Sequence, residues 1–207
     1  LAATRPCLRG RDVGASAAPR CLVPYDGAAL VPWPELARRW PRAAAHLEAQ
    51  RAILEQRERG RFTGARFHAF GRPQNLAFHA DVAPKVVVPD VARDGRAMID
   101  ASGALVLDSA YAIRARADAP PDYDPALLAL ILSSPIVALW LAHAGVPLRG
   151  GYRRMKTAYL APLPLPPPDA LAAVRAAIDR GDRLQALDQL RASYGLDAAV
   201  WRDHAGT

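Results

Sequence analysis

The chain has 207 residues, of which 51% are apolar and 23% are charged. It is long enough to bury a hydrophobic core but too short for two full-sized domains with linkers. It contains no uninterrupted apolar run near the roughly 20 residues that a membrane-spanning helix needs. Its two cysteines have no neighbouring Cys or His at metal-ligand spacing, so we expect no metal and a cytoplasmic location. The chain starts at Leu1 without a secretory signal, and we expect it to be a fragment of a longer protein.

The formal net charge is +7, which favours an acidic partner, most often a nucleic acid. Because 25 of the 27 basic residues are Arg, a general compositional bias toward Ala, Arg and Pro explains much of this charge. Such a bias does not explain clustering. One segment of eight residues contains four basic side chains and no acid: Arg149, Arg153, Arg154 and Lys156. We interpret this segment as a local positive patch.

The first half of the chain alternates between extended and helical patterns. Residues 1–30 contain short apolar pieces broken by Gly and Pro, which predicts strands and turns. From Pro34 to Arg59 apolar residues recur every three or four positions, which predicts one amphipathic helix. Residues 60–80 lack a steady period and should be irregular or form short strands. Residues 85–89 and 104–113 should be strands that neighbour each other in one sheet.

The second half is predicted to be helical. Asp124-Pro125 is typical of a helix start, and an apolar helix should run from there to Leu132. A second apolar helix is expected over 135–143, ending near Gly145, with the pair covering one face of the sheet. The Pro-rich residues 161–168 should run extended, and 169–180 and 183–194 should form a helical hairpin.

These patterns predict an α+β fold, with a twisted, largely antiparallel sheet flanked by helices and a C-terminal helical hairpin. We expect a target-binding domain over residues 1–160, a Pro-rich connector over 161–168 and the hairpin over 169–207.

The sequence lacks the usual motifs of enzymes. It has no glycine-rich strand-to-helix loop for a dinucleotide or S-adenosylmethionine and no phosphate-binding loop. Its five His residues are scattered, and none lies near a Ser or Cys in a catalytic pattern. We therefore expect no catalytic residue, no cofactor and no enzymatic activity in the isolated chain.

Three polar segments carry side chains suited to nucleic acid. In Arg9-Gly10-Arg11 a glycine between two guanidinium groups permits close backbone approach, although a structural turn explains it equally well. The segment 71–75 contains Arg72, Gln74 and Asn75, whose side chains can pair with guanine or adenine. The alternative there is a turn stiffened by Pro73 in which Asn75 caps the backbone. The third segment, 148–156, places Tyr152 among Arg149, Arg153, Arg154 and Lys156, which suits phosphate contacts, a solvated loop being the alternative.

Six segments in this order resemble the C-terminal specificity domain of TaqI-like adenine-specific DNA methyltransferases and related fused restriction-modification enzymes. They are R-G-R-D-V, F-G-R-P-Q-N-L, P-K-V-V-V-P-D-V, L-D-S-A-Y, L-L-A-L-I-L-S-S-P and R-G-G-Y-R-R-M-K-T-A-Y-L-A-P-L-P-L-P, and they cover about residues 5–168. The family's usual Asn before Pro135 is replaced here by Ser133 or Ser134.

The resemblance implies a role in recognising double-stranded DNA, beside a methyltransferase domain of the same parent chain that would hold S-adenosylmethionine. In that family the domain reads the target while the adenine is flipped into the catalytic pocket. The alternative is a protein-interaction module that binds a partner subunit through the Pro-rich tail and the helical hairpin.

Overall fold

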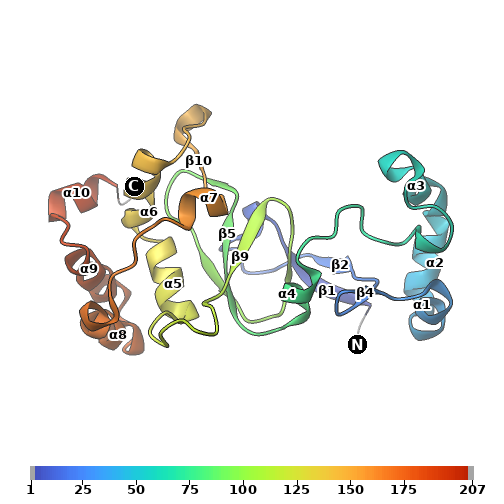
Figure 1. Ribbon diagram of the computed structural model, residues 1–207, viewed down its shortest axis with the longest axis horizontal. Helices are drawn as coiled ribbons and strands as arrows, with labels where there is room; N and C mark the ends of the chain where they lie inside the picture. The colour runs from blue at the N-terminus through green and yellow to red at the C-terminus, as the bar shows by residue number, and fades with distance from the viewer. Residues whose placement is uncertain (1–2, 205–207) are drawn as a thin grey trace. The chain divides into compact units, whose positions relative to one another are not determined.

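The computed structural model describes residues 3–204, and its contacts divide the chain into two compact units. Unit 1 comprises 1–7, 19–83 and 102–105, and unit 2 comprises 8–18, 84–101 and 106–207. Helices and small antiparallel sheets occur together, which confirms the predicted α+β class (Figure 1). The predicted division at residues 160 and 168 stays a prediction.

Unit 1 begins with short strands. Strand β1 (Thr4–Leu8) pairs antiparallel with β2 (Arg20–Leu22), with Arg5 opposite Cys21. Strands β3 (Tyr25–Asp26) and β4 (Ala29–Leu30) form a tight hairpin. Gly27 in its turn has φ +60°, a conformation that glycine adopts without steric cost. The predicted strand-and-turn character of residues 1–30 is confirmed over the described residues 3–30.

The predicted single helix over 34–59 is wrong, because three shorter helices occupy this region. They are α1 (Trp33–Arg39), α2 (Pro41–Ala49) and α3 (Arg51–Glu55). Trp40 has φ −138° and ψ 69°, since the following proline ring excludes helical backbone at the residue before it. The apolar period nevertheless identified the buried face, because Leu36 and Ala44 form a small core with Val31.

Residues 60–80 are irregular, as predicted, but they contain helical turns in place of strands. Two 3₁₀ turns, η2 (Arg57–Gly60) and η3 (Gly64–Arg66), precede the short helix α4 (Leu76–Ala80). His68 is buried, and its Nε2 lies 2.9 Å from the carbonyl oxygen of Val31, which ties this irregular chain to the core of unit 1.

Unit 2 is built on a three-stranded antiparallel sheet in the order β7-β5-β9. Its strands are β5 (Lys85–Pro89), β7 (Met98–Asp100) and β9 (Ala110–Ile113). Strand β8 (Leu105–Val106) belongs to a different sheet, in which it pairs with β1. The pairing of β5 with β9 confirms that the two predicted strand regions are neighbours. Every residue of β5 is buried, as expected for a central strand covered on both faces. A separate pair joins β6 (Val91–Ala92) to β10 (Arg153–Arg154).

Two apolar helices follow at the predicted positions. Helix α5 (Pro125–Leu132) is capped by Asp124, whose carboxylate accepts the backbone N–H of Leu127, and it packs on β5 and β7. Helix α6 (Pro135–Ala144) starts after a break at Ser133 and Ser134. In the part of the chain that the structure describes, no single helix could cross a membrane. The pair α5 and α6 reaches the required length and composition together but bends by 60°.

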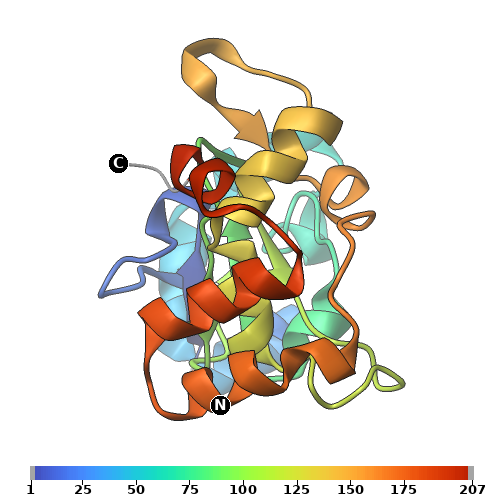
Figure 2. The ribbon, with the colours of Figure 1, turned by 90° about the vertical axis from the view of Figure 1, so that its left-hand side faces the viewer.

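The C-terminal segment forms the predicted hairpin from η5 (Pro168–Leu171), α8 (Ala172–Asp179) and α9 (Arg183–Ser193). A further helix, α10 (Ala198–Asp203), was not predicted, and the short helix α7 (Thr157–Leu160) precedes the Pro-rich stretch. Helices α8 and α9 pack on α5, on the side away from the sheet (Figures 1 and 2). Their apolar face is therefore part of the main core of unit 2.

Candidate nucleic-acid interface

The basic segment 148–156 forms a narrow loop that returns on itself in unit 2. Pro147 and Arg153 form a β-bridge, and the N–H of Leu148 donates to the carbonyl of Tyr152 at 2.7 Å. The turn is made by Gly150 and Gly151, whose φ angles of +77° and +78° are favourable only for glycine. The two glycines therefore shape the loop, which the sequence alone left undecided.

Aromatic and basic side chains meet on this loop. Tyr152 is 39% exposed, and the guanidinium carbon of Arg93 lies 4.9 Å from the centre of its ring. Arg149 and Lys156 are exposed to solvent on either side. The predicted basic residues thus remain accessible, and Arg93 adds a cation that is distant in sequence.

Arg154 differs from its neighbours because an acid neutralises it. Its Nη1 donates to the Asp90 carboxylate at 2.8 Å, and the hydroxyl of Tyr111 donates to the other oxygen at 3.1 Å. Burial, followed by the adjacent Asp90, raises the pKa of Tyr111 above its usual value. The interpretation of this patch as free of acid holds along the sequence but fails in space. Arg154 holds the loop against β5 and presents less free charge than the sequence suggests.

The structure brings the segment Arg9-Gly10-Arg11 to the same region of unit 2. The N–H of Gly10 donates to Ser109 Oγ at 3.1 Å, and the N–H of Asp90 donates to the carbonyl of Ser109 at 2.8 Å. A side chain at position 10 would clash with that carbonyl oxygen, so glycine is required there. Ser109 therefore connects two segments that the sequence identified separately.

The two arginines of this segment have different environments. Arg9 forms an ion pair with Asp12 at 2.9 Å, and hydrogen bonds from Arg9 lower the pKa of that carboxyl group. Arg11 is exposed. Arg11 is therefore the better placed of the two to contact an external anion.

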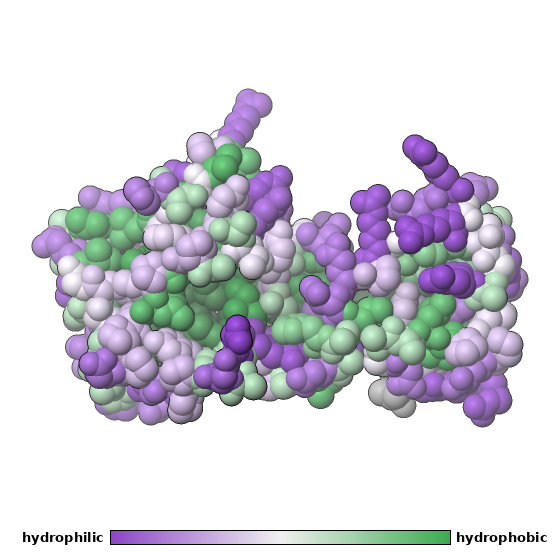
Figure 3. Space-filling view, viewed as in Figure 1, coloured by the Kyte–Doolittle hydropathy of each residue, from purple (hydrophilic) through white to green (hydrophobic). Residues whose placement is uncertain are grey.

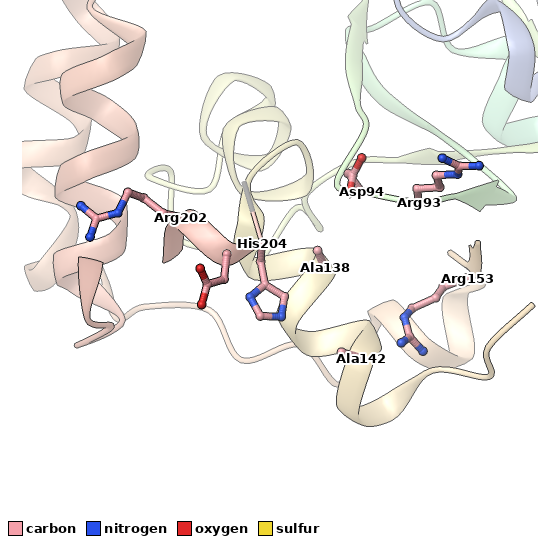
Figure 4. Close-up of a pocket in the computed structure, with 8 residues that line it drawn as sticks. Arg93, Asp94, Ala138, Ala142, Arg153, Arg202 and His204 are labelled. Carbon is pink, nitrogen blue, oxygen red and sulfur yellow. The ribbon is translucent and has the colours of Figure 1, made fainter. Parts of the chain in front are cut away.

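A pocket of about 360 Å³ lies beside the basic loop in unit 2. Three arginines and one histidine line it with two aspartates, and two alanines of α6 form part of its wall (Figure 4). The lining residues are Arg93, Asp94, Ala138, Ala142, Arg153, Arg202, Asp203 and His204. Sequence reasoning missed Arg93, Arg202 and His204, because Arg93 lies 109 positions before Arg202 and both lie about 50 to 60 positions from Arg153. The excess of cationic groups suits this pocket to a phosphate or another small anion.

The segment 71–75 lies in unit 1, whereas the basic loop lies in unit 2. Arg72 is 77% exposed and forms an ion pair with Glu58 at 3.2 Å. Asn75 adopts left-handed backbone with φ 52° at the start of α4, but its side chain makes no capping hydrogen bond. Gln74 is exposed as well. The alternative of Asn75 as a side-chain cap is therefore wrong, and the side chains of all three polar residues lie at the surface.

Among residues 3–204, no group of three or more His, Cys, Asp or Glu side chains could hold a metal ion. No protein-family model matches the chain, and no curated protein matches it significantly.

The chain does resemble solved structures. One of them is the Type IIL restriction-modification enzyme MmeI in complex with DNA, with a TM-score of 0.62 and 13% sequence identity. The match covers 95% of this chain and 28% of that enzyme's chain. The likeness therefore concerns the fold of one segment of a much longer enzyme.

Proposed function

We propose that this chain is the sequence-specific double-stranded DNA recognition domain of an adenine-specific DNA methyltransferase or fused restriction-modification enzyme, similar to the TaqI-like specificity domains. The fold likeness to a segment of a restriction-modification enzyme solved with DNA carries the proposal, because it extends over 95% of the chain. The order of the six sequence segments supports it independently.

The surface chemistry of unit 2 supports contacts with the DNA backbone. Arg149, Arg153 and Lys156 lie on or beside a loop that is shaped by two glycines, next to a pocket with an excess of cationic groups. Phosphate contacts of this kind give affinity and orientation without reading sequence. We assign base reading to Arg72, Gln74 and Asn75, whose exposed side chains can form bidentate bonds with base edges.

In this proposal the catalytic work lies outside the chain. A methyltransferase domain of the parent protein, working in the cytoplasm, would bind S-adenosylmethionine and transfer the methyl group. Flipping a base costs roughly a few kcal/mol of stacking and pairing, and a recognition domain that grips the duplex can offset this cost. We therefore expect calorimetry to detect no S-adenosylmethionine binding by the isolated chain. Micromolar binding of S-adenosylmethionine to the isolated chain would contradict the assignment of catalysis to a separate domain.

The alternative of a protein-interaction module through the hairpin has less support. Leu171, Val174 and Leu190, on η5, α8 and α9, are fully buried in the core of unit 2. The hydroxyls of Tyr123 and Tyr194 donate to the carbonyls of Pro166 and Pro164 at 2.8 Å, which holds the Pro-rich stretch against the same unit. These surfaces are already used within the chain, which leaves less of them for a partner.

The test is a fluorescence-anisotropy titration of the chain with duplex DNA between about 50 and 200 mM salt. The unchanged chain should bind, and its affinity should fall steeply as salt increases. Arg153→Gln should weaken binding to every duplex similarly and lower the salt slope by roughly one unit. The matched control is Arg116→Gln, which removes one exposed charge that is already paired with Asp118. Absence of duplex binding, or affinity that ignores salt, would overturn the proposal.

Sequence reading is tested in the full-length parent. In Gln74→Ala the rates of methylation of a cognate site and of a site altered at one base should become more similar, since a bidentate base contact discriminates against the wrong base by about 1–3 kcal/mol. Unchanged site preference would move base reading away from residues 71–75.

A further inference from the structure

The loop Arg57–Arg66 of unit 1, here called the arginine loop, has an unusual backbone. Glu58 has φ 48°, Arg59 has φ 60° and Gly60 has φ 81°, so three consecutive residues are left-handed. For residues other than glycine this conformation costs roughly 1–2 kcal/mol each. It persists only where the surrounding structure enforces it, and such positions cluster at functional sites.

The enforcing contacts come from one half-buried arginine side chain, Arg57, and one glutamate, Glu55. Arg57 donates to the carbonyl of Leu54 at 2.9 Å, before the loop, and to those of Phe67 and Ala69 at 2.7 and 2.9 Å, after it. The N–H of Gly64 donates to the carboxylate of Glu55 at 3.2 Å. The two ends of the loop are therefore tied together.

Two buried aromatic side chains pack beneath the loop, on its inner face. Phe62 and Phe67 are buried, with exposures of 4% and 0%. The guanidinium carbon of Arg51 lies 3.7 Å from the ring centre of Phe67, and that of Arg57 lies 5.5 Å from that of Phe62. The apolar groups of the loop thus point inward, which leaves polar groups for its outer face.

The outer face of the loop is cationic. Arg59, Arg61 and Arg66 are exposed, and within residues 3–204 neither Arg59 nor Arg66 forms an ion pair. Hydrophilic side chains project from the surface over α3 and the turn after it (Figure 3, viewed as Figure 1). The one acid of the loop, Glu58, is paired with Arg72. That ion pair places the arginine loop beside the segment 71–75.

We propose that the arginine loop is a further, preformed DNA-binding element, which contacts phosphates next to the bases read by residues 71–75. The inference rests on the proposed function and extends it to a surface that no sequence motif identified. A loop that is already rigid loses little entropy on binding, so its contacts contribute more fully to affinity. An acidic protein is a poorer match, because protein interfaces concentrate energy in exposed aromatic anchors, and both phenylalanines here are buried.

The experiment uses the full 207-residue chain and the double variant R59Q/R66Q. The matched control is R38Q/R42Q, which removes two exposed arginines from α1 and α2 of the same unit. Duplex affinity of R59Q/R66Q at 0.1 M salt should fall roughly tenfold or more, and its salt slope should fall by about two units. The control should change both values much less, and both variants should keep the thermal unfolding temperature of the unchanged chain.

The outcomes separate the two proposals. If the unchanged chain binds no duplex, the proposed function and the arginine loop are both overturned. If the chain binds duplex and R59Q/R66Q behaves like its control, only the arginine loop is overturned. A parallel titration with polyglutamate covers the acidic-protein case, since loss of polyglutamate binding without loss of duplex binding also overturns the inference.

Discussion

Replacing Lys85 with methionine should destabilise unit 2 strongly. Lys85 lies opposite Asp100 in the pairing of β5 with β7, and its ammonium group donates to the Asp100 carboxylate. The two side chains are only 1% and 4% exposed. In Lys85→Met the carboxylate loses the Lys85 ammonium group while it stays away from water. Removing one partner of a buried ion pair typically costs about 3–5 kcal/mol.

Such a loss is a large part of the roughly 5–15 kcal/mol that stabilises a typical domain. Urea unfolding followed by circular dichroism should therefore show a much lower midpoint for Lys85→Met with a similar slope. The double variant Lys85→Met/Asp100→Leu removes both charges and should recover most of the loss, because apolar replacement of a whole buried pair is often neutral or stabilising. The reasoning is refuted if Lys85→Met costs less than about 1 kcal/mol, or if the double variant is the less stable of the two.

Two further predictions use the same unfolding assay. Gly10→Ala should destabilise the protein by roughly 1–3 kcal/mol, because the new methyl group would clash with the carbonyl of Ser109. Its control, Gly71→Ala, meets open space and should be neutral or slightly stabilising. Equal effects of the two changes would contradict the close approach at position 10. Asp124→Ala, which removes the cap of α5 and the ion pair with Arg175, should cost about 1–2 kcal/mol and more than Asp124→Asn, which keeps a capping oxygen. Although burial disfavours its charged form, the hydrogen bonds from Arg175 and from the N–H of residue 127 lower the pKa of Asp124 below its ordinary 3.8. The contribution of Asp124 to the free energy of unfolding should therefore be complete above pH 3.8 and be lost as the pH falls below that value. If the unchanged chain and Asp124→Asn lose stability equally on acidification, this reasoning is contradicted.

Local patterns were enough to predict much of the architecture. The Asp124-Pro125 start, the Ser133–Pro135 break and the valine-rich strand 85–89 each depend on neighbouring residues, and the structure has all three. The break at Trp40 was also predictable, because a residue before proline avoids helical backbone. The apolar period extended across this break, however, and favoured one helix.

The candidate site was less predictable from local pattern. The sequence identified Arg72 and Arg154 as basic residues in polar segments, but it did not identify their acidic partners. Glu58 lies 14 positions from Arg72, and Asp90 lies 64 positions from Arg154. The strained backbone at Arg59 also has no local signature, because the contacts that enforce it join the Arg57 side chain to backbone carbonyls on both sides of the loop.

The sequence by itself determined how many charges the chain carries, where helices and strands can form and which positions along the chain are cationic. Only the tertiary structure decided which of these charges remain available, since electrostatic interaction depends on separation in space and on exposure to water. Folding pairs Arg154 with Asp90 and Arg9 with Asp12, and it leaves Arg11, Arg59 and Arg66 exposed.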